Sequence, residues 1–195
     1  LNNHIGVPLT LLSFTSETEI GIVEMGANHK KEIEFLCELA QPDYGYITNF
    51  GKAHLEGFGG VQGVIEGKSE MYTFLSNNEK LAFVNLEDPI QVQKTSSFNH
   101  YTFGVNKSDA NVSIEKVTAN PFVSVVFEDL KIASHLIGLY NANNINAAIA
   151  IGNYFKVSND AIKSALEGYI PENNRSQLIT KGTNQIILDA YNANP

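Results

Sequence analysis

The sequence contains one cysteine among its 195 residues, Cys37, so no internal disulfide framework can form. A solitary thiol suits a reducing compartment. Cys37 lies at helical spacing from Ile33, Leu36 and Ala40, and this pattern predicts that the thiol packs in the core rather than reacts.

Long apolar runs and basic clusters are also missing. No run approaches the roughly 18 apolar residues of a membrane span, and no charged-then-apolar signal sequence opens the chain. We therefore expect a cytoplasmic protein without membrane insertion. The net charge is -8 and Lys30-Lys31 is the only adjacent basic pair, which argues against a nucleic-acid partner. A small polyanion such as ATP remains a possible ligand, because Mg²⁺ can supply positive charge locally.

The first half of the chain alternates predicted strands with predicted helices. Short apolar runs predict strands at residues 20–25, 44–48 and 81–85. Helical spacing predicts helices at about 33–40, with Asn28 as the cap, and at about 61–75. This alternation is typical of an α/β domain.

After about residue 100 the pattern changes. Strands are expected at 112–117, 122–127 and 130–137 without intervening helices, which indicates an antiparallel β insert at approximately 105–138. Helices at about 141–155 and 159–167 and a buried strand at 185–189 follow. The predicted fold class is α/β: one domain over 1–195 with a mostly parallel sheet, flanking helices and a small antiparallel β subdomain.

Polar side chains end three of the predicted strands: Glu24, Asn49 after Thr48, and Asp189. Ligands of open α/β sheets bind outside the carboxyl ends of the strands. One such acid more often caps a turn, but three together favour a metal or nucleotide site. His54, in a glycine-rich segment just beyond the second strand, could reach a metal or could be an ordinary packed or surface histidine.

Lys68 falls inside the apolar stripe of the helix predicted at 61–75. An ammonium group there is costly unless it is paired or chemically changed. It either reaches water along its stem, or meets carboxylates, or reacts with CO₂ to give a carbamate that helps hold Mg²⁺; the residues alone leave these readings open. Gly67-Lys68-Ser69 resembles the end of a phosphate-binding loop, but Gln62 stands where that motif requires glycine.

Asn141 and Asn144 lie one turn apart at the start of a predicted helix. Their amides suit the edge of an adenine, although for Asn141 taken alone helix capping is the preferred reading. Arg175 stands in a predicted loop, where its guanidinium is either solvated or in contact with phosphate.

Four strings occur in an order that resembles a known family. They are residues 2–12 (Asn-Asn-His-Ile-Gly-Val-Pro-Leu-Thr-Leu-Leu), 24–29 (Glu-Met-Gly-Ala-Asn-His), 53–59 (Ala-His-Leu-Glu-Gly-Phe-Gly) and 189–195 (Asp-Ala-Tyr-Asn-Ala-Asn-Pro). They closely resemble the central ATP-binding domain of the Mur ligases, and within that family the UDP-N-acetylmuramoyl-tripeptide–D-alanyl-D-alanine ligases. The second and third strings separate this group from other Mur ligases.

The resemblance implies a role for each candidate residue. Glu24 and His54 correspond to Mg²⁺ ligands, and Lys68 corresponds to the lysine that the family carbamylates. The remaining matches are Asn141 and Asn144 near adenine, Arg175 at the phosphates, Asp189 at the ribose, and Asn49 beside the metal and phosphates. Two departures are Leu188, where relatives have a first acid of a pair, and Asn174, where relatives often have glycine.

The implied activity is ATP-dependent joining of D-alanyl-D-alanine to UDP-N-acetylmuramoyl-tripeptide through an acyl phosphate, with ATP and two Mg²⁺ ions. The family's Gly-Lys-Thr phosphate loop and its two outer domains lie outside these 195 residues, so we expect the chain alone to fold but to have little ligase activity. Alternatives are another Mur or folylpolyglutamate-type ligase, or a non-catalytic nucleotide-binding module on the same scaffold.

Overall fold

The computed structural model describes residues 1–52, 54–172 and 177–188. The chain divides into two compact units. The N-terminal unit comprises Leu1–Ala82 and Lys94–His100, and the C-terminal unit comprises the described residues of Phe83–Gln93 and Tyr101–Asn194.

A four-stranded sheet has the strand order β1 (Tyr44–Tyr46), β2 (Leu81–Asn85), β3 (His100–Val105), β4 (Val112–Ile114). In β2 the last four residues are buried, as expected of a strand covered on both faces. Strands β3 and β4 pair in parallel, with Phe103 opposite Val112. The strands predicted at 44–48 and 81–85 are confirmed, whereas β3 was not predicted.

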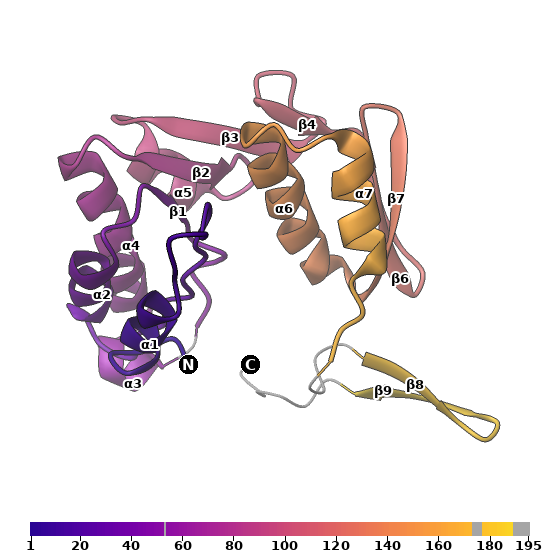
Figure 1. Ribbon diagram of the computed structural model, residues 1–195, viewed down its shortest axis with the longest axis horizontal. Helices are drawn as coiled ribbons and strands as arrows, with labels where there is room; N and C mark the ends of the chain where they lie inside the picture. The colour runs from indigo at the N-terminus through magenta and orange to yellow at the C-terminus, as the bar shows by residue number, and fades with distance from the viewer. Residues whose placement is uncertain (53, 173–176, 189–195) are drawn as a thin grey trace. The chain divides into compact units, whose positions relative to one another are not determined.

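The N-terminal unit contains α1 (Gly6–Leu12), α2 (Glu32–Ala40), α3 (Leu55–Phe58) and α4 (Val61–Asn77). Helix α2 packs against both α1 and α4, and α3 packs against α4 (Figure 1). The buried face of α2 consists of Ile33, Leu36 and Cys37. Burial raises the pKa of the Cys37 thiol to about 12, so the thiol stays protonated and the predicted packing role is confirmed.

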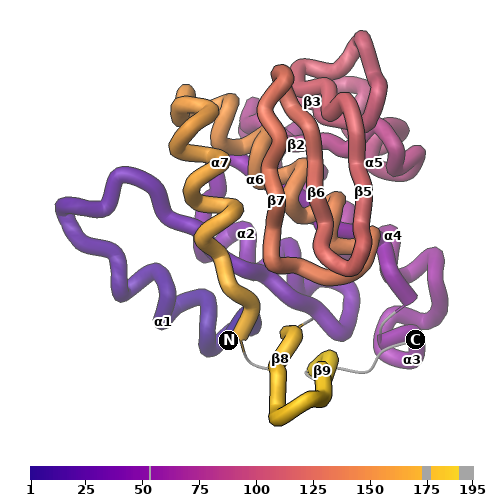
Figure 2. Tube along the Cα trace, turned by 90° about the vertical axis from the view of Figure 1, so that its right-hand side faces the viewer, coloured from indigo at the N-terminus to yellow at the C-terminus, as the bar shows by residue number. Residues whose placement is uncertain are grey.

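The C-terminal unit contains the antiparallel sheet β5 (Lys116–Ala119), β6 (Phe122–Phe127) and β7 (Leu130–Ile137), whose strands lie side by side in Figure 2. Alternate residues of β6 are buried, as expected of a sheet with one covered face. Helix α6 (Ala142–Tyr154) packs against β4 and β6, and α7 (Asn159–Gly168) packs against β7. The remaining elements are α5 (Pro89–Thr95), the 3₁₀ turn η1 (Leu139–Asn141) and the hairpin β8 (Gln177–Lys181) and β9 (Asn184–Leu188).

The predicted fold class is confirmed: α/β, with a parallel sheet, flanking helices and a small antiparallel sheet. The helices predicted at 33–40, 61–75, 141–155 and 159–167 correspond to α2, α4, η1 with α6, and α7. Among the described residues, no helix is long and apolar enough to cross a membrane.

The strand predicted at residues 20–25 is wrong. This segment has no regular secondary structure, and Ile20 and Ile22 are 57% and 85% exposed. An apolar run becomes a buried strand only where neighbouring strands pair with its backbone. The described part of the chain supplies no such neighbour for this run.

Two further strand predictions need correction. The strand predicted at 112–117 divides at Glu115, because Val112 and Ile114 belong to β4 while the following residues form β5 of the other sheet. The buried strand predicted at 185–189 corresponds, up to residue 188, to β9, which among the described strands pairs with β8 alone and leaves Ile187 58% exposed. A two-stranded hairpin cannot bury both of its faces.

Gly63 of α4 provides a test of the packing between α3 and α4. A Cβ at this position would lie 1.8 Å from the backbone oxygen of Phe58, which is too close for any side chain. We expect Gly63→Ala to lower the free energy of unfolding by about 1–3 kcal/mol, as overpacking does. Urea denaturation followed by circular dichroism measures it. Thr73→Ala, at an exposed position of the same helix, should change it by less than about 0.5 kcal/mol; equal effects of the two variants would contradict the packing.

Candidate functional site

Lys68 and Asn49 are brought together, although they lie far apart in the sequence. The Lys68 Nζ atom donates a hydrogen bond to the Asn49 backbone oxygen, at 2.7 Å. Lys68 forms no ion pair within the described residues, and burial lowers the pKa of its ammonium group. A larger fraction of this amine is therefore neutral and nucleophilic than for an exposed lysine. The sequence left open that Lys68 pairs with a carboxylate. Within the described residues it does not.

Asn49 also shapes the glycine-rich segment that follows β1. Its side-chain Oδ1 accepts a hydrogen bond from the Gly51 backbone N–H at 2.9 Å. A Cβ at Gly51 would lie only 2.9 Å from the same oxygen. The segment therefore turns sharply after Asn49. The Asn49 backbone oxygen stays available to Lys68.

Glu24 lies on the irregular segment that was predicted to be a strand, and its side chain is exposed. One carboxylate oxygen accepts a hydrogen bond from Asn2 Nδ2 at 2.9 Å. The Gly26 backbone N–H donates to the Asn2 backbone oxygen at 2.7 Å. Asn2 therefore contacts both the Glu24 carboxylate and the backbone of the same segment at Gly26. The only sequence signal for this role was the position of Asn2 in the first family string.

His54 immediately precedes α3 and is exposed. Its backbone lies in the left-handed region, at φ 56°, which non-glycine residues adopt uncommonly. The carbonyl oxygen of His54 accepts a hydrogen bond from the Phe58 N–H at 3.2 Å. The α3 turn therefore fixes the backbone from which the imidazole projects.

Gly57 joins the His54 segment to the Asn28-His29 segment. A Cβ at Gly57 would lie 2.2 Å from the Asn28 backbone oxygen and 3.2 Å from His29 Nε2. Only glycine permits this approach of two backbones. The second and third family strings, which carry Glu24 and His54, are therefore in direct contact.

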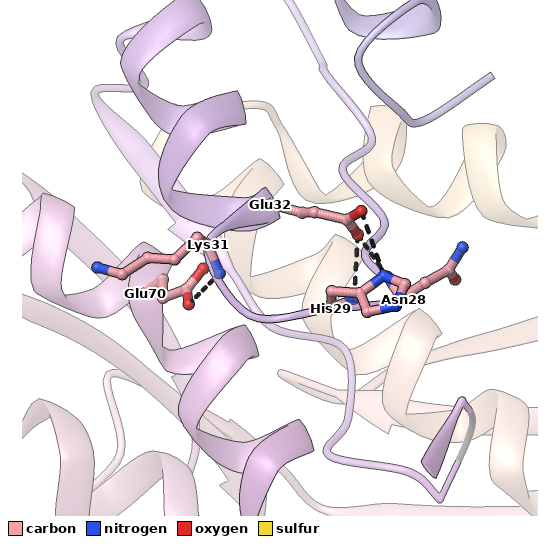
Figure 3. A network of polar contacts seen from close by, with 5 residues as sticks. All are labelled: Asn28, His29, Lys31, Glu32 and Glu70. Atoms are coloured by element: carbon pink, nitrogen blue, oxygen red, sulfur yellow. Dashed lines mark hydrogen bonds and ion pairs between the residues drawn. The ribbon is translucent and has the colours of Figure 1, made fainter. Parts of the chain in front are cut away.

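The start of α2 is capped by acids rather than by Asn28, whose predicted capping role is wrong. The residue that precedes α2 is Lys31, at φ 74°, and no side chain of that residue caps the helix. Glu70 of α4 accepts hydrogen bonds from the Lys31 and Glu34 N–H groups, at 2.6 and 3.1 Å (Figure 3 draws the bond to Lys31). A carboxylate at these donors satisfies both groups and complements the helix dipole.

Glu32 performs the same function for the loop before α2 (Figure 3). Its carboxylate accepts hydrogen bonds from the Asn28 N–H at 2.6 Å and the His29 N–H at 3.1 Å. It also lies 3.6 Å from His29 Nδ1. The bond from Asn28 is the main cause of the lowered pKa of Glu32. Nothing in the sequence pattern distinguished Glu32 and Glu70 from the other acids of α2 and α4.

The described residues contain no group of three or more histidine, cysteine, aspartate or glutamate side chains that could hold a metal ion. Glu24 and His54 offer a carboxylate oxygen and an imidazole nitrogen, both known metal donors. A third ligand from the described residues would have to be of another kind.

In the C-terminal unit, Asn141 and Asn144 contact each other. Asn141 is buried, and its Nδ2 donates to the Ile137 backbone oxygen at 2.8 Å. Asn144 is exposed, and its Nδ2 donates to Asn141 Oδ1 at 3.3 Å. Asn141 therefore positions Asn144, the more accessible of the two amides. Arg175 and Asp189 lie outside the described residues.

The sequence matches a known family of proteins. Residues 1–152 match the family model of the Mur ligase middle domain, and the chain belongs to the Mur ligase family. Among curated relatives, it is 32% identical over its whole length to the UDP-N-acetylmuramoyl-tripeptide–D-alanyl-D-alanine ligase of Bacillus subtilis, of which it covers 43%.

Solved structures agree. A MurF structure from Acinetobacter baumannii superposes with a TM-score of 0.87 at 29% identity, covering 99% of this chain and 44% of that one. The MurF ligase of Thermotoga maritima in complex with ADP superposes with a TM-score of 0.80 at 26% identity, covering 99% and 46%. The chain thus spans less than half the length of the relatives it matches.

The Glu70 cap can be tested against its neighbour one turn away. Glu70→Ala leaves the Lys31 and Glu34 N–H groups without their acceptor, and we expect it to lower the free energy of unfolding by about 1–2 kcal/mol. Glu66→Ala removes an exposed ion pair with Lys30 and should have a clearly smaller effect. Thermal or urea unfolding measures both variants. Similar losses of unfolding free energy in the two variants would show that the hydrogen bonds from the backbone to Glu70 stabilise the fold no more than an exposed ion pair does.

Glu32 gives a pH-dependent prediction. Its pKa in the folded protein lies below the usual 4.5, so the ionised form favours folding above that value, and this contribution is lost as the pH falls through the folded-state pKa. The stability advantage of the parent over Glu32→Gln should therefore shrink as the pH is lowered from about 7 to about 3. Urea titrations at a series of pH values measure it. An advantage that is constant or grows toward acid would contradict this sign.

Proposed function

We propose that the full protein joins D-alanyl-D-alanine to UDP-N-acetylmuramoyl-tripeptide at the expense of ATP, in peptidoglycan precursor synthesis. The observation that carries this proposal is the likeness along the whole chain to ligases named for that reaction. The ADP complex of the Thermotoga maritima relative supports nucleotide binding by this scaffold.

In the proposed reaction, the tripeptide's terminal carboxylate takes the γ-phosphoryl group of ATP, giving an acyl phosphate and ADP. The amine of the dipeptide then attacks the acyl carbon, an amide bond forms, and phosphate leaves. Both reactants of the first step are anionic, so they must be held close together against their repulsion. The chain must therefore supply residues that position a nucleotide and bring positive charge to it.

The residues that would hold Mg²⁺ are Glu24, His54 and Lys68. Bound Mg²⁺ would neutralise the phosphate and carboxylate charges. Glu24 is oriented by Asn2, and His54 is presented at the start of α3. Lys68 in its ammonium form cannot bind a cation, so the proposal requires its carbamate. Mg²⁺ prefers oxygen ligands, which a carbamate provides.

The environment of Lys68 supports carbamate formation. CO₂ reacts with the neutral amine: the nitrogen forms a bond to carbon, a proton is released, and an anionic carbamate results. The pKa of Lys68 is lowered by burial, which favours the reactive form. In the same proposal, Asn49 lies beside the metal and phosphates, Asn141 and Asn144 approach the adenine, Arg175 faces the phosphates, and Asp189 contacts the ribose.

The experiment is to replace Lys68 in the full protein and to measure phosphate release with ATP, UDP-N-acetylmuramoyl-tripeptide and D-alanyl-D-alanine. Lys68→Ala should lower kcat by about 100-fold or more, as loss of a transition-state contact does, and short carboxylic acids should restore part of it. Lys80→Ala, which removes an exposed lysine paired with Asp43, is the matched control and should leave kcat unchanged.

Two results would contradict the proposal. Full activity of untreated Lys68→Ala would remove the carbamate from the mechanism. Binding of ADP to the parent protein without turnover of any ligase substrate would favour the non-catalytic nucleotide-binding module. Carbon-13 NMR with labelled bicarbonate adds a readout that does not depend on turnover: a carbamate signal present in the parent should vanish in Lys68→Ala.

A further inference from the structure

We propose that His29 accepts the proton that the dipeptide amine releases when it attacks the acyl phosphate, with Glu32 as the residue that orients the imidazole. This inference rests on the proposed function, because it assigns a base to the second step of that reaction. The observations that support it come from the loop before α2 and from α3, both in the N-terminal unit.

The second step of the proposed reaction needs a proton acceptor. An α-amino group is largely protonated at neutral pH, and the amide that forms keeps one hydrogen, so the nitrogen loses two protons. The nitrogen forms its bond to the acyl carbon, and the bond from that carbon to the phosphate oxygen breaks, with its electron pair leaving on phosphate. One proton goes to the released phosphate. The other needs a base, and a positioned base accelerates such a step by about 10²–10⁴-fold.

Other acids and bases of this region already have a role. The proposed function uses Glu24 and His54 as Mg²⁺ ligands. Glu32 and Glu70 accept backbone N–H groups before and at the start of α2. His29 belongs to the second family string, and its side chain is 65% exposed. Its imidazole is therefore accessible to a substrate amine and has no metal to bind in the proposed reaction.

Glu32 contacts His29 in two places (Figure 3). The Glu32 Oε2 atom accepts the His29 backbone N–H at 3.1 Å, and the Oε1 atom lies 3.6 Å from His29 Nδ1. A carboxylate beside Nδ1 favours the tautomer whose Nε2 is free to accept, and it stabilises the imidazolium that forms. The contacts of catalytic groups are often long before the substrate binds.

The Nε2 atom of His29 lies against the third family string. A Cβ at Gly57 would lie 3.2 Å from this nitrogen, so a larger residue at that position would cover it. Gly57 shares α3 and the turn before it with His54. The accepting nitrogen is therefore next to the string that carries one proposed Mg²⁺ ligand, and His29 itself is in the string that carries the other.

Carboxylates are present on both elements that contact the ring. Glu32 belongs to α2, and the exposed Glu56 precedes Gly57 on α3. Lys30, in the same loop as the ring, is paired with Glu66 of α4. An imidazolium formed at this place therefore has a carboxylate partner at ion-pair distance.

The test separates the two steps of the reaction in the full protein. A single turnover with all three substrates is stopped by rapid quenching, and ADP and the ligated product are measured. His29→Gln should form ADP at the rate of the parent and should slow product formation by about 100-fold or more. His100→Gln replaces another exposed histidine and should leave both rates unchanged. Product formation at the parent rate in His29→Gln, or ADP and product slowed in parallel, would overturn the proposal.

The pH dependence gives a second readout. Histidine takes up its proton between about pH 8 and about pH 5, and a protonated imidazole cannot act as a base. The ratio of the product-formation rates of the parent and His29→Gln should therefore fall toward one as the pH is lowered over this range. Protonation of the dipeptide amine slows both proteins alike and cancels in the ratio. A ratio that does not change with pH would remove His29 as the base and leave the ligase proposal intact, whereas a parent that forms neither ADP nor product would contradict the ligase proposal itself.

Discussion

The candidate site of the N-terminal unit depends on a steric constraint: three backbone segments approach so closely that glycine is required where they meet. Gly57 lies against the Asn28 backbone oxygen, and Gly63 and Gly67 lie against the backbone and ring of Phe58. These contacts join the segment of Glu24, the segment of His54 and the helix of Lys68. Packing therefore accounts for the glycine at position 57 of the third family string and for its contact with the second.

Three charged side chains of this unit form hydrogen bonds with backbone groups. The Lys68 ammonium group meets a carbonyl oxygen, while Glu32 and Glu70 accept N–H groups at the start of α2. The carboxylates thereby become structural supports, while burial, not the carbonyl contact, lowers the pKa of the Lys68 ammonium group. Glu32 and Glu70 hold the backbone before and at the start of α2, and Lys68 contacts the backbone that follows β1.

Local patterns in the sequence predicted much of the fold. Helical periodicity located α2, α4, α6 and α7, because each buries one face and the apolar spacing records it. The run at 20–25 failed as a strand because apolar composition does not supply pairing partners. The prediction of one continuous strand at 112–117 failed because the segments on both sides of Glu115 favour strands. Only their pairing assigns them to different sheets.

The candidate site was less accessible to sequence reasoning. Lys68 stood out as a charge within an apolar stripe, and the structure places it against Asn49. Asn2, Glu32 and Glu70 act through contacts between segments distant in the chain, so no local spacing marks them.

The most direct test of the central claim is a crystal structure of the full protein with ADP and Mg²⁺ at a resolution that shows the Lys68 terminus. The account predicts a planar carbamate on Nζ, with Glu24, His54 and that carbamate gathered around the ions. An unmodified ammonium group, with the three side chains on separate surfaces, would contradict it.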